Sequence, residues 1–149
     1  MTAFWDWALE AYARPGVAEA CLELQDAHGQ NVPLLLWAAW TAQEGRPADV
    51  GAAARLARAW EADAVGPLRA VRRILKQPRV GFDEAAREGL RARIKAVELE
   101  SERVLMASLE ALSAAGPARA DAQARLCEAA RAYGAPVGAE VFSSLLARL

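Results

Sequence analysis

Residues Gln25–Trp40 read QDAHGQNVPLLLWAAW, and this stretch decides how the chain folds. His28 and Gly29 are predicted to end one helix, because glycine adopts the left-handed conformation that follows a helix without steric cost. Asn31 is suited to cap the next helix, and Pro33 falls in its first turn, where no backbone N–H is needed. The stretch therefore predicts a sharp corner between two helices.

The helix after this corner is predicted to lie at the centre of the fold. From Leu34 to Trp40 no polar residue interrupts the sequence. A helix that is apolar on every side must be surrounded by other elements. We therefore expect the helix Val32–Gln43 to be central, with the rest of the chain wrapped around it.

Helical periodicity continues through the other segments, which are rich in alanine, leucine, arginine and glutamate. No segment alternates apolar and polar residues for long enough to predict a strand. The other expected helices are Ala3–Ala13 (capped by Thr2), Val17–His28, a helix opened by Asp49, Leu68–Gln77 after a kink or short break at Gly66–Pro67, Glu84–Ala114, Arg119–Tyr133 and Ala139–Ala147. We predict an all-α fold in one domain, residues 1–149: a single compact orthogonal bundle of seven to eight helices around Val32–Gln43.

Composition limits the classes of function. The chain has 149 residues, of which 54% are apolar, so a core can form without metals or disulfides. A net charge of −1 argues against a globally basic nucleic-acid binder and against an acidic disordered tail. Cys21 and Cys127 are far apart and fall at apolar helical positions, as reduced core cysteines do. No signal peptide is evident, and the apolar run Val32–Ala42 is shorter than the roughly 20 residues of a membrane span, so we expect a cytoplasmic protein without a membrane partner.

The only histidine lies at the predicted corner, among other polar residues. Gln25, Asp26, His28 and Asn31 are close in sequence and can form a small polar site at the junction of two helices. The alternative is structural, with His28 hydrogen-bonding the turn and holding the corner. One histidine alone makes neither a metal site nor a catalytic triad, and no glycine-rich phosphate loop follows a strand. We therefore expect no catalytic residue, no metal and no cofactor.

A cluster of cations follows the Gly66–Pro67 break. Between Ala64 and Phe82 the chain has no acidic residue and five basic ones, Arg69, Arg72, Arg73, Lys76 and Arg79. On a helix these cations fill one arc, and the opposite arc holds Leu68, Val71, Ile74 and Leu75. Such a basic face can bind an acidic protein surface, a phosphorylated ligand or nucleic acid. The alternatives are a solvated face, or one neutralised within the fold by Glu98, Glu102 and Glu110.

The tryptophans are numerous for this length: Trp5, Trp7, Trp37, Trp40 and Trp60. We expect them in the core, and the alternative is an apolar ligand pocket between helices. Trp7 is the exception, because it lies off the apolar stripe predicted for the first helix, which consists of Phe4, Trp5, Ala8, Leu9 and Tyr12. We expect Trp7 to be exposed and to serve as an interface residue.

The N-terminal third of the chain resembles DUF2390, a bacterial family of roughly this length with no assigned function. The matching residues are Phe4–Trp40, FWDWALEAYARPGVAEACLELQDAHGQNVPLLLWAAW, and a weaker match continues to Trp60 and through Pro67–Lys76. The first match is specific, because ARPGV followed by LQDAHG and a leucine-rich tryptophan helix is an unusual combination. The resemblance implies an all-helical cytosolic protein and supplies no activity, cofactor or site residue.

These patterns favour a small non-enzymatic cytosolic helical module, an adaptor that acts through contacts with another protein. The alternative is binding of an anionic ligand or nucleic acid by the basic face, Arg69–Arg79. The neutral net charge and the lack of interleaved aromatic residues weaken the nucleic-acid version most. The sequence leaves the identity of the partner and the oligomeric state open.

Replacing Leu35 with alanine tests the central position of Val32–Gln43. Truncating a buried leucine loses the transfer free energy of the removed atoms and leaves a cavity. Leu35→Ala is therefore expected to lower the unfolding free energy by about 2–5 kcal/mol in urea denaturation. A loss of less than about 0.5 kcal/mol, the size of ordinary surface substitutions, would contradict the central position.

Overall fold

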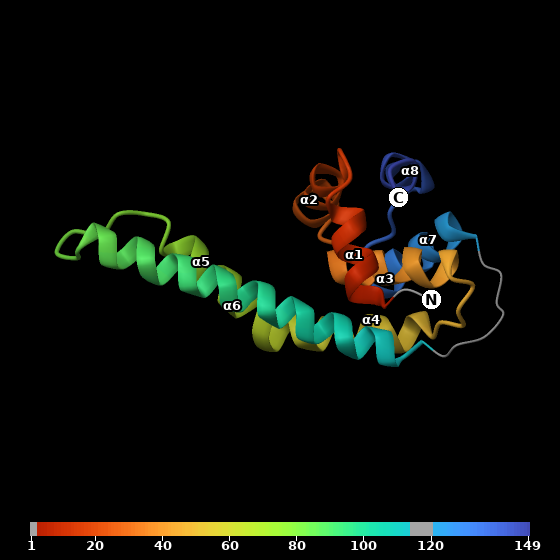
Figure 1. The fold of residues 1–149 in the computed structure, drawn as a ribbon, viewed down its shortest axis with the longest axis horizontal. Helices are drawn as coiled ribbons and strands as arrows, with labels where there is room; N and C mark the ends of the chain where they lie inside the picture. Colours follow the sequence, from red (N-terminus) through yellow and green to blue (C-terminus); the bar gives the residue numbers. More distant parts are fainter. Residues whose placement is uncertain (1–2, 114–120) are drawn as a thin grey trace.

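The computed structural model describes residues 3–113 and 121–149, and every regular element in them is helical (Figure 1). The elements are α1 (Phe4–Tyr12), α2 (Val17–Asp26), α3 (Val32–Gln43), α4 (Val50–Trp60), the π-helical segment η1 (Glu61–Val65), α5 (Gly66–Ile74), α6 (Glu84–Ala111), α7 (Ala122–Tyr133) and α8 (Ala139–Leu146). The all-α fold predicted from the sequence is confirmed. Thr2, Ala114 and Arg119, where a cap or a helix end was predicted, lie outside the described residues. No helix among the described residues is both long and apolar enough to cross a membrane.

The predicted corner between α2 and α3 is confirmed, although α2 ends two residues earlier than expected. α2 stops at Asp26, and Gly29 then takes a φ of +60°, in the left-handed region. The side chain of Asn31 caps α3 by accepting the Leu34 N–H at 3.0 Å. Pro33 lies in the first turn, as predicted. The corner is therefore built by local backbone and capping geometry.

α3 lies at the centre of the fold. Its residues from Pro33 to Ala42 are all buried, and Trp37 and Trp40 have no exposed surface. Helices α1, α2, α4, α6 and α7 all pack against it. The ring of Phe4 from α1 stacks on Trp40 with 5.2 Å between the ring centroids. This burial on every side is what the uninterrupted apolar sequence of α3 requires.

α1 buries a different face from the predicted one, and the expected exposure of Trp7 is wrong. The buried residues of α1 are Phe4, Trp7, Ala8 and Ala11. Leu9 and Tyr12, which belong to the predicted stripe, are 53% and 41% exposed. Burying the Trp7 ring leaves no unpaired donor, because its Nε1–H donates to Gln43 Oε1 at 3.1 Å. Trp7 therefore anchors α1 on α3 and offers no exposed surface for an interface.

α5 and α6 form an antiparallel hairpin that projects from the rest of the molecule (Figure 1). We call residues 66–97 the arm and the other described residues the body. The loop 75–83 forms the free end of the arm. The C-terminal half of α6 contributes Leu105, Met106 and Leu109 to the core. One long helix therefore belongs to both parts of the molecule.

The irregularity predicted at Gly66–Pro67 takes the form of a π-helical segment that precedes the proline. α4 runs directly into η1 and then into α5. The Gly66 N–H donates to the Glu61 carbonyl five residues earlier, which is the hydrogen bond of a π-helix. A Cβ at position 66 would lie 2.7 Å from that carbonyl oxygen, so the turn requires glycine. The structure therefore has a wider turn here instead of the expected kink or break, and the helix continues after it.

Replacing Gly66 with alanine tests this turn. The added methyl group would meet backbone, which cannot move aside as a flexible side chain can, so Gly66→Ala is expected to lower the unfolding free energy by about 1–3 kcal/mol. The matched control is Gly89→Ala in α6, where nothing lies within 4 Å of an added Cβ. The control should be neutral or stabilise the protein by up to about 1 kcal/mol. Urea denaturation compares the two variants, and equal effects would rule out a steric role for Gly66.

Candidate functional site

A polar pocket lies where the α2–α3 corner meets η1, α5, α6 and the end of α7. Its volume is about 150 Å³. The residues that line it are Gln25, Gly29, Gln30, Asn31, Val32, Pro33, Glu61, Val65, Arg69, Glu102, Leu105 and Tyr133. The pocket is therefore the place where parts of the predicted polar junction and of the predicted basic face meet.

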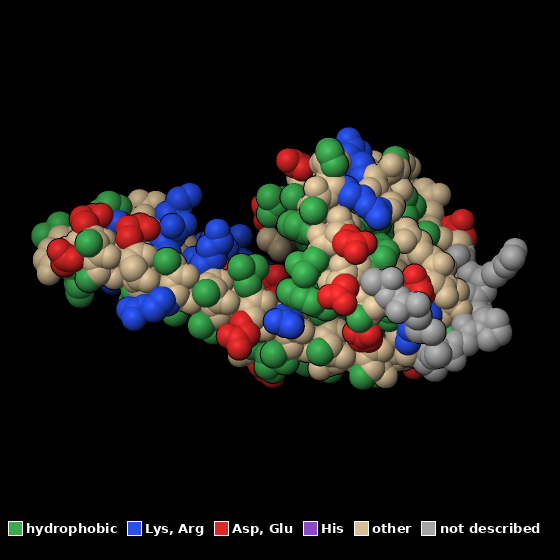
Figure 2. Space-filling model, viewed as in Figure 1, with side chains coloured by type: hydrophobic (Ala, Val, Ile, Leu, Met, Phe, Trp, Pro, Cys, Tyr) green, Lys and Arg blue, Asp and Glu red, His purple; other side chains and the backbone are tan. Residues whose placement is uncertain are grey.

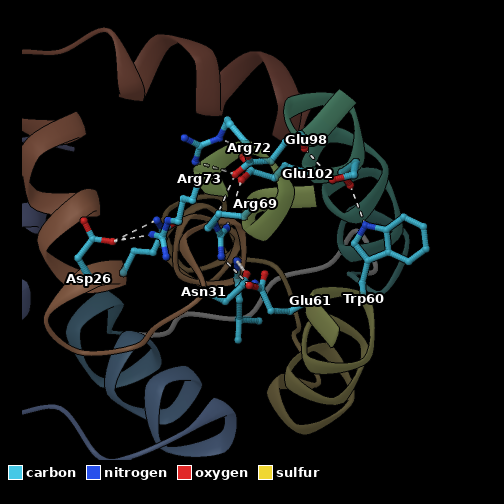
Figure 3. A network of polar contacts seen from close by, with 12 residues as sticks. Asp26, Asn31, Trp60, Glu61, Arg69, Arg72, Arg73, Glu98 and Glu102 are labelled. Carbon is cyan, nitrogen blue, oxygen red and sulfur yellow. Dashed lines mark hydrogen bonds and ion pairs between the residues drawn. The ribbon is translucent and has the colours of Figure 1, made fainter. Parts of the chain in front are cut away.

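The four residues of the predicted polar junction have different surroundings. Gln25 and Asn31 line the pocket. Asp26 is exposed and faces Arg73 of the arm (Figure 3). His28 is half-buried and is not among the pocket residues. The structure therefore does not bring the four side chains together into one site.

Ion pairs fasten the base of the arm, and Arg69 is at their centre (Figure 3). Arg69 Nη1 lies 2.6 Å from Glu61 Oε1. Its other nitrogens lie 3.3 Å from Glu98 Oε1 and 3.8 Å from Glu102 Oε1. Arg72 donates to both carboxylate oxygens of Glu98. Because the Glu98 side chain is only 8% exposed, solvent screens these pairs weakly.

This ion-pair network shows how two of the five predicted basic-face residues are used. Arg69 and Arg72 are neutralised within the fold, which is the alternative to an anion-binding face. Residues of the opposite arc are exposed in their place, since Val71 is 43% and Ile74 is 55% exposed. α5 therefore does not pack by an apolar face alone, although Leu68 and Leu75 of the same arc are half-buried.

The other three predicted basic residues lie toward solvent. Arg73 Nη2 is 4.0 Å from Asp26 Oδ1, and both side chains are more than half exposed. Lys76 and Arg79 are exposed. Figure 2 shows Lys and Arg side chains along the edge of the arm that faces the hollow between arm and body. Their charges therefore remain available to a partner, whereas those of Arg69 and Arg72 do not.

Burial changes the acid–base properties of two pocket groups. The pKa of Glu102 is raised, mainly by burial; Arg69 opposes this shift by attraction, and the Glu98 and Glu61 carboxylates add to it. The pKa of Tyr133 is also raised, again mainly by burial. Both groups therefore hold their protons to higher pH than they would in water.

Cys21 is not placed for nucleophilic chemistry. Cys21 and Cys127 are both free. Burial raises the pKa of the Cys21 thiol to about 12, so this thiol stays protonated at neutral pH and is a poor nucleophile. Within residues 3–113 and 121–149, no three histidine, cysteine, aspartate or glutamate side chains are arranged to hold a metal ion.

Sequence reasoning missed Gln30, Glu61 and Tyr133 as pocket residues. Glu61, and not the expected Glu110, completes the acidic set around Arg69. Residues eight apart do not align on a regular α-helix of 3.6 residues per turn, but the extra residue of the π turn brings Glu61 and Arg69 onto one face. The only local signal for this alignment is the Gly66–Pro67 pair that marks the irregular turn.

The free end of the arm exposes large apolar side chains. Ile74, Val80 and Phe82 are 55%, 104% and 68% exposed. Figure 2 shows hydrophobic side chains at this end, remote from the body. Between Val80 and Phe82 the chain turns at Gly81, whose φ of +87° favours glycine. We call Ile74, Val80 and Phe82 the tip.

Replacing Glu102 with glutamine tests how much stability the protein loses by burying an ionised carboxylate at this position. The folded state binds the Glu102 proton more tightly than the unfolded chain, so this group's contribution to stability falls as the pH rises above the ordinary pKa of 4.5. Glu102→Gln is therefore expected to have a higher Tm than the wild type at neutral pH, with an advantage that shrinks as the pH falls toward 4.5 and is absent below it. Thermal unfolding across this pH range, with exposed Glu128→Gln as the control, measures the effect. An advantage that does not change with pH would contradict it.

Comparison with known proteins places the chain in a family. The model of a family described as proteins of unknown function, DUF2390, matches residues 3–109. The match includes the arm and the ion-pair network, and it extends beyond Lys76, where the resemblance seen in the sequence ends. No curated protein and no protein of known structure matches the chain. Since the family model covers well over half of the 149 residues, the chain belongs to the DUF2390 family.

Proposed function

We propose that this chain is a small non-enzymatic protein-binding module, an adaptor that docks through the tip of its arm. One observation supports the proposal above the others: Ile74, Val80 and Phe82 expose 55%, 104% and 68% of their surface at the end of a projecting hairpin. Large apolar side chains exposed together are typical of interaction surfaces. Phe82 is the natural anchor, since aromatic side chains dominate the binding energy of many interfaces.

Ion pairs and hydrogen bonds hold the arm in shape at both ends. Near the free end, buried Arg87 donates a hydrogen bond to the Leu75 carbonyl at the C-terminus of α5. Its guanidinium also pairs with Glu84 at 2.7 Å and with Glu88 at 3.0 Å. The ion-pair network of Arg69 fastens the base. A surface that is already ordered loses less conformational entropy when it binds, which favours affinity.

The charges beside the tip indicate the chemistry of the partner. Lys76 and Arg79 are exposed and close in sequence to Ile74 and Val80. Cations at the rim of an apolar anchor are complementary to carboxylates on the other surface and speed association. The proposed partner is therefore another protein that offers an apolar pocket bordered by acidic side chains. We place this interaction in the cytoplasm, which the two free cysteines support.

The alternative, binding of an anionic ligand or nucleic acid, retains fewer residues than the sequence suggests. Carboxylates engage Arg69 and Arg72, so this function would depend on Arg73, Lys76 and Arg79. Binding dominated by phosphate contacts weakens steeply with salt as counterions are released. Docking by apolar side chains weakens much less, and this difference separates the two functions.

A pull-down from lysate tests the proposal with a Val80→Ser/Phe82→Ser variant. Both residues are exposed, so the double variant should fold with a stability within about 0.5 kcal/mol of the wild type per substitution. The wild type is expected to retain a protein partner at moderate salt after nuclease treatment, and the variant is expected to lose it. The matched control is Leu22→Ser in α2, a residue that is 51% exposed on the body and should not affect capture.

A second variant, Lys76→Glu/Arg79→Glu, examines the charged rim. It should slow association with the same partner without abolishing it, because rim charges act mainly on the association rate. Retention of the partner by Val80→Ser/Phe82→Ser would contradict docking through the tip. Recovery of nucleic acid only, at low salt only, and its loss in the charge variant would favour the anion-binding alternative.

A further inference from the structure

One flank of α6 carries a second exposed apolar surface. Leu90, Val97 and Val104 are 42%, 45% and 49% exposed. They are spaced by seven residues, so they lie close to one line along an α-helix. We call these three residues the stripe. The residues that α6 buries against α5 and the body form a different set, Arg87, Glu98, Ser101, Leu105, Met106 and Leu109.

The stripe is symmetric about Val97. Leu90 lies seven residues before it and Val104 seven residues after it. Two exposed charges of opposite sign follow this symmetry to within one residue, since Arg93 precedes Val97 by four residues and Glu100 follows it by three. At about 100° per residue, Arg93 and Glu100 lie on the same edge of the stripe. Val97 is also near the middle of α6, Glu84–Ala111.

We propose that the stripe binds a second copy of this chain, with the two α6 helices antiparallel and a two-fold axis passing beside Val97. A two-fold interface needs a surface that complements itself, so that residue i meets residue j and j meets i. Reversal about Val97 places Leu90 opposite Val104 of the second copy. It also places Arg93 opposite Glu100 of the second copy, and the symmetry repeats this ion pair on the other side of the axis.

The helix geometry brings these charges level. With a rise of 1.5 Å per residue, Arg93 lies about 6 Å from the axis, and Glu100 of the second copy lies about 4.5 Å from it on the same side. The remaining offset of about 1.5 Å is well within the reach of the two side chains. Exposed Ala86, Ala107 and Ala111 lie on the same edge as Arg93 and allow the helices to approach closely. Because Val97 is central, the two helices overlap along their full length.

The first test compares two glutamate substitutions on α6. Val97→Glu places two like charges beside the two-fold axis and should weaken the dimer on the order of a hundredfold. Leu99→Glu is the matched control, because Leu99 is 56% exposed and, two residues further along, lies on nearly the opposite side of α6. Sedimentation velocity across the micromolar range measures the dissociation constants. Circular dichroism checks that both variants retain the helix content of the wild type.

The second test exchanges the two charges. Arg93→Glu and Glu100→Arg should each weaken the dimer by about tenfold, because each turns both symmetric attractions into repulsions. The double variant Arg93→Glu/Glu100→Arg should recover wild-type association, since each copy again offers opposite charges to the other. A mixture of the two single variants should form a mixed dimer more tightly than either variant alone.

Three results would overturn the proposal. They are a monomeric wild type throughout the concentration series, equal weakening by Val97→Glu and Leu99→Glu, and a double variant no stronger than the single ones. The last result would exclude the antiparallel arrangement in particular. None of these substitutions changes the tip, so loss of the dimer and loss of the partner that binds the tip are separate outcomes.

Discussion

Burial of α3 on every side is the constraint on which the rest of the structure depends. Because no face of α3 is suited to water, helices from both ends of the sequence must cover it. α6 covers one part of α3 with its C-terminal half. At 28 residues α6 is about 42 Å long, so its N-terminal half extends beyond the core. This excess length forms one side of the arm, and α5, which precedes α6 in the chain, forms the other side.

Ion pairs lie in the contact between α5 and α6. Arg69 and Arg72 turn toward Glu98, and a largely buried charge is tolerated only when it is paired. Pairing therefore favours one register of the hairpin. Its consequence is that apolar residues of both helices stay outside, among them Val71 on α5 and Val97 on α6.

The structural features that could be predicted from the sequence are the ones that a few neighbouring residues decide. Gly29, Asn31 and Asp49 act on the backbone within one helical turn, and each occupies its predicted place. The pocket could be predicted only in part, because it combines Asn31 with residues of η1, α6 and α7. The sequence marks Arg69 as a candidate binding residue but leaves its role open. The sequence pattern around a basic residue is the same whether water or a carboxylate of another helix neutralises its charge.

The sequence by itself determined the helices, most of their ends and the central place of α3, because helix propensity, capping and all-round apolarity are local properties. Only the tertiary structure decided which face of α1 is buried. Apolar residues occur on more than one side of that helix, and the hydrogen bond from Trp7 to Gln43 belongs to one packing only. Only the tertiary structure decided that Arg69 and Arg72 point inward and that the hairpin projects. The reason is that a charge can be buried only where another element brings the opposite charge to it. The periodicity of one segment does not show which distant element packs against it.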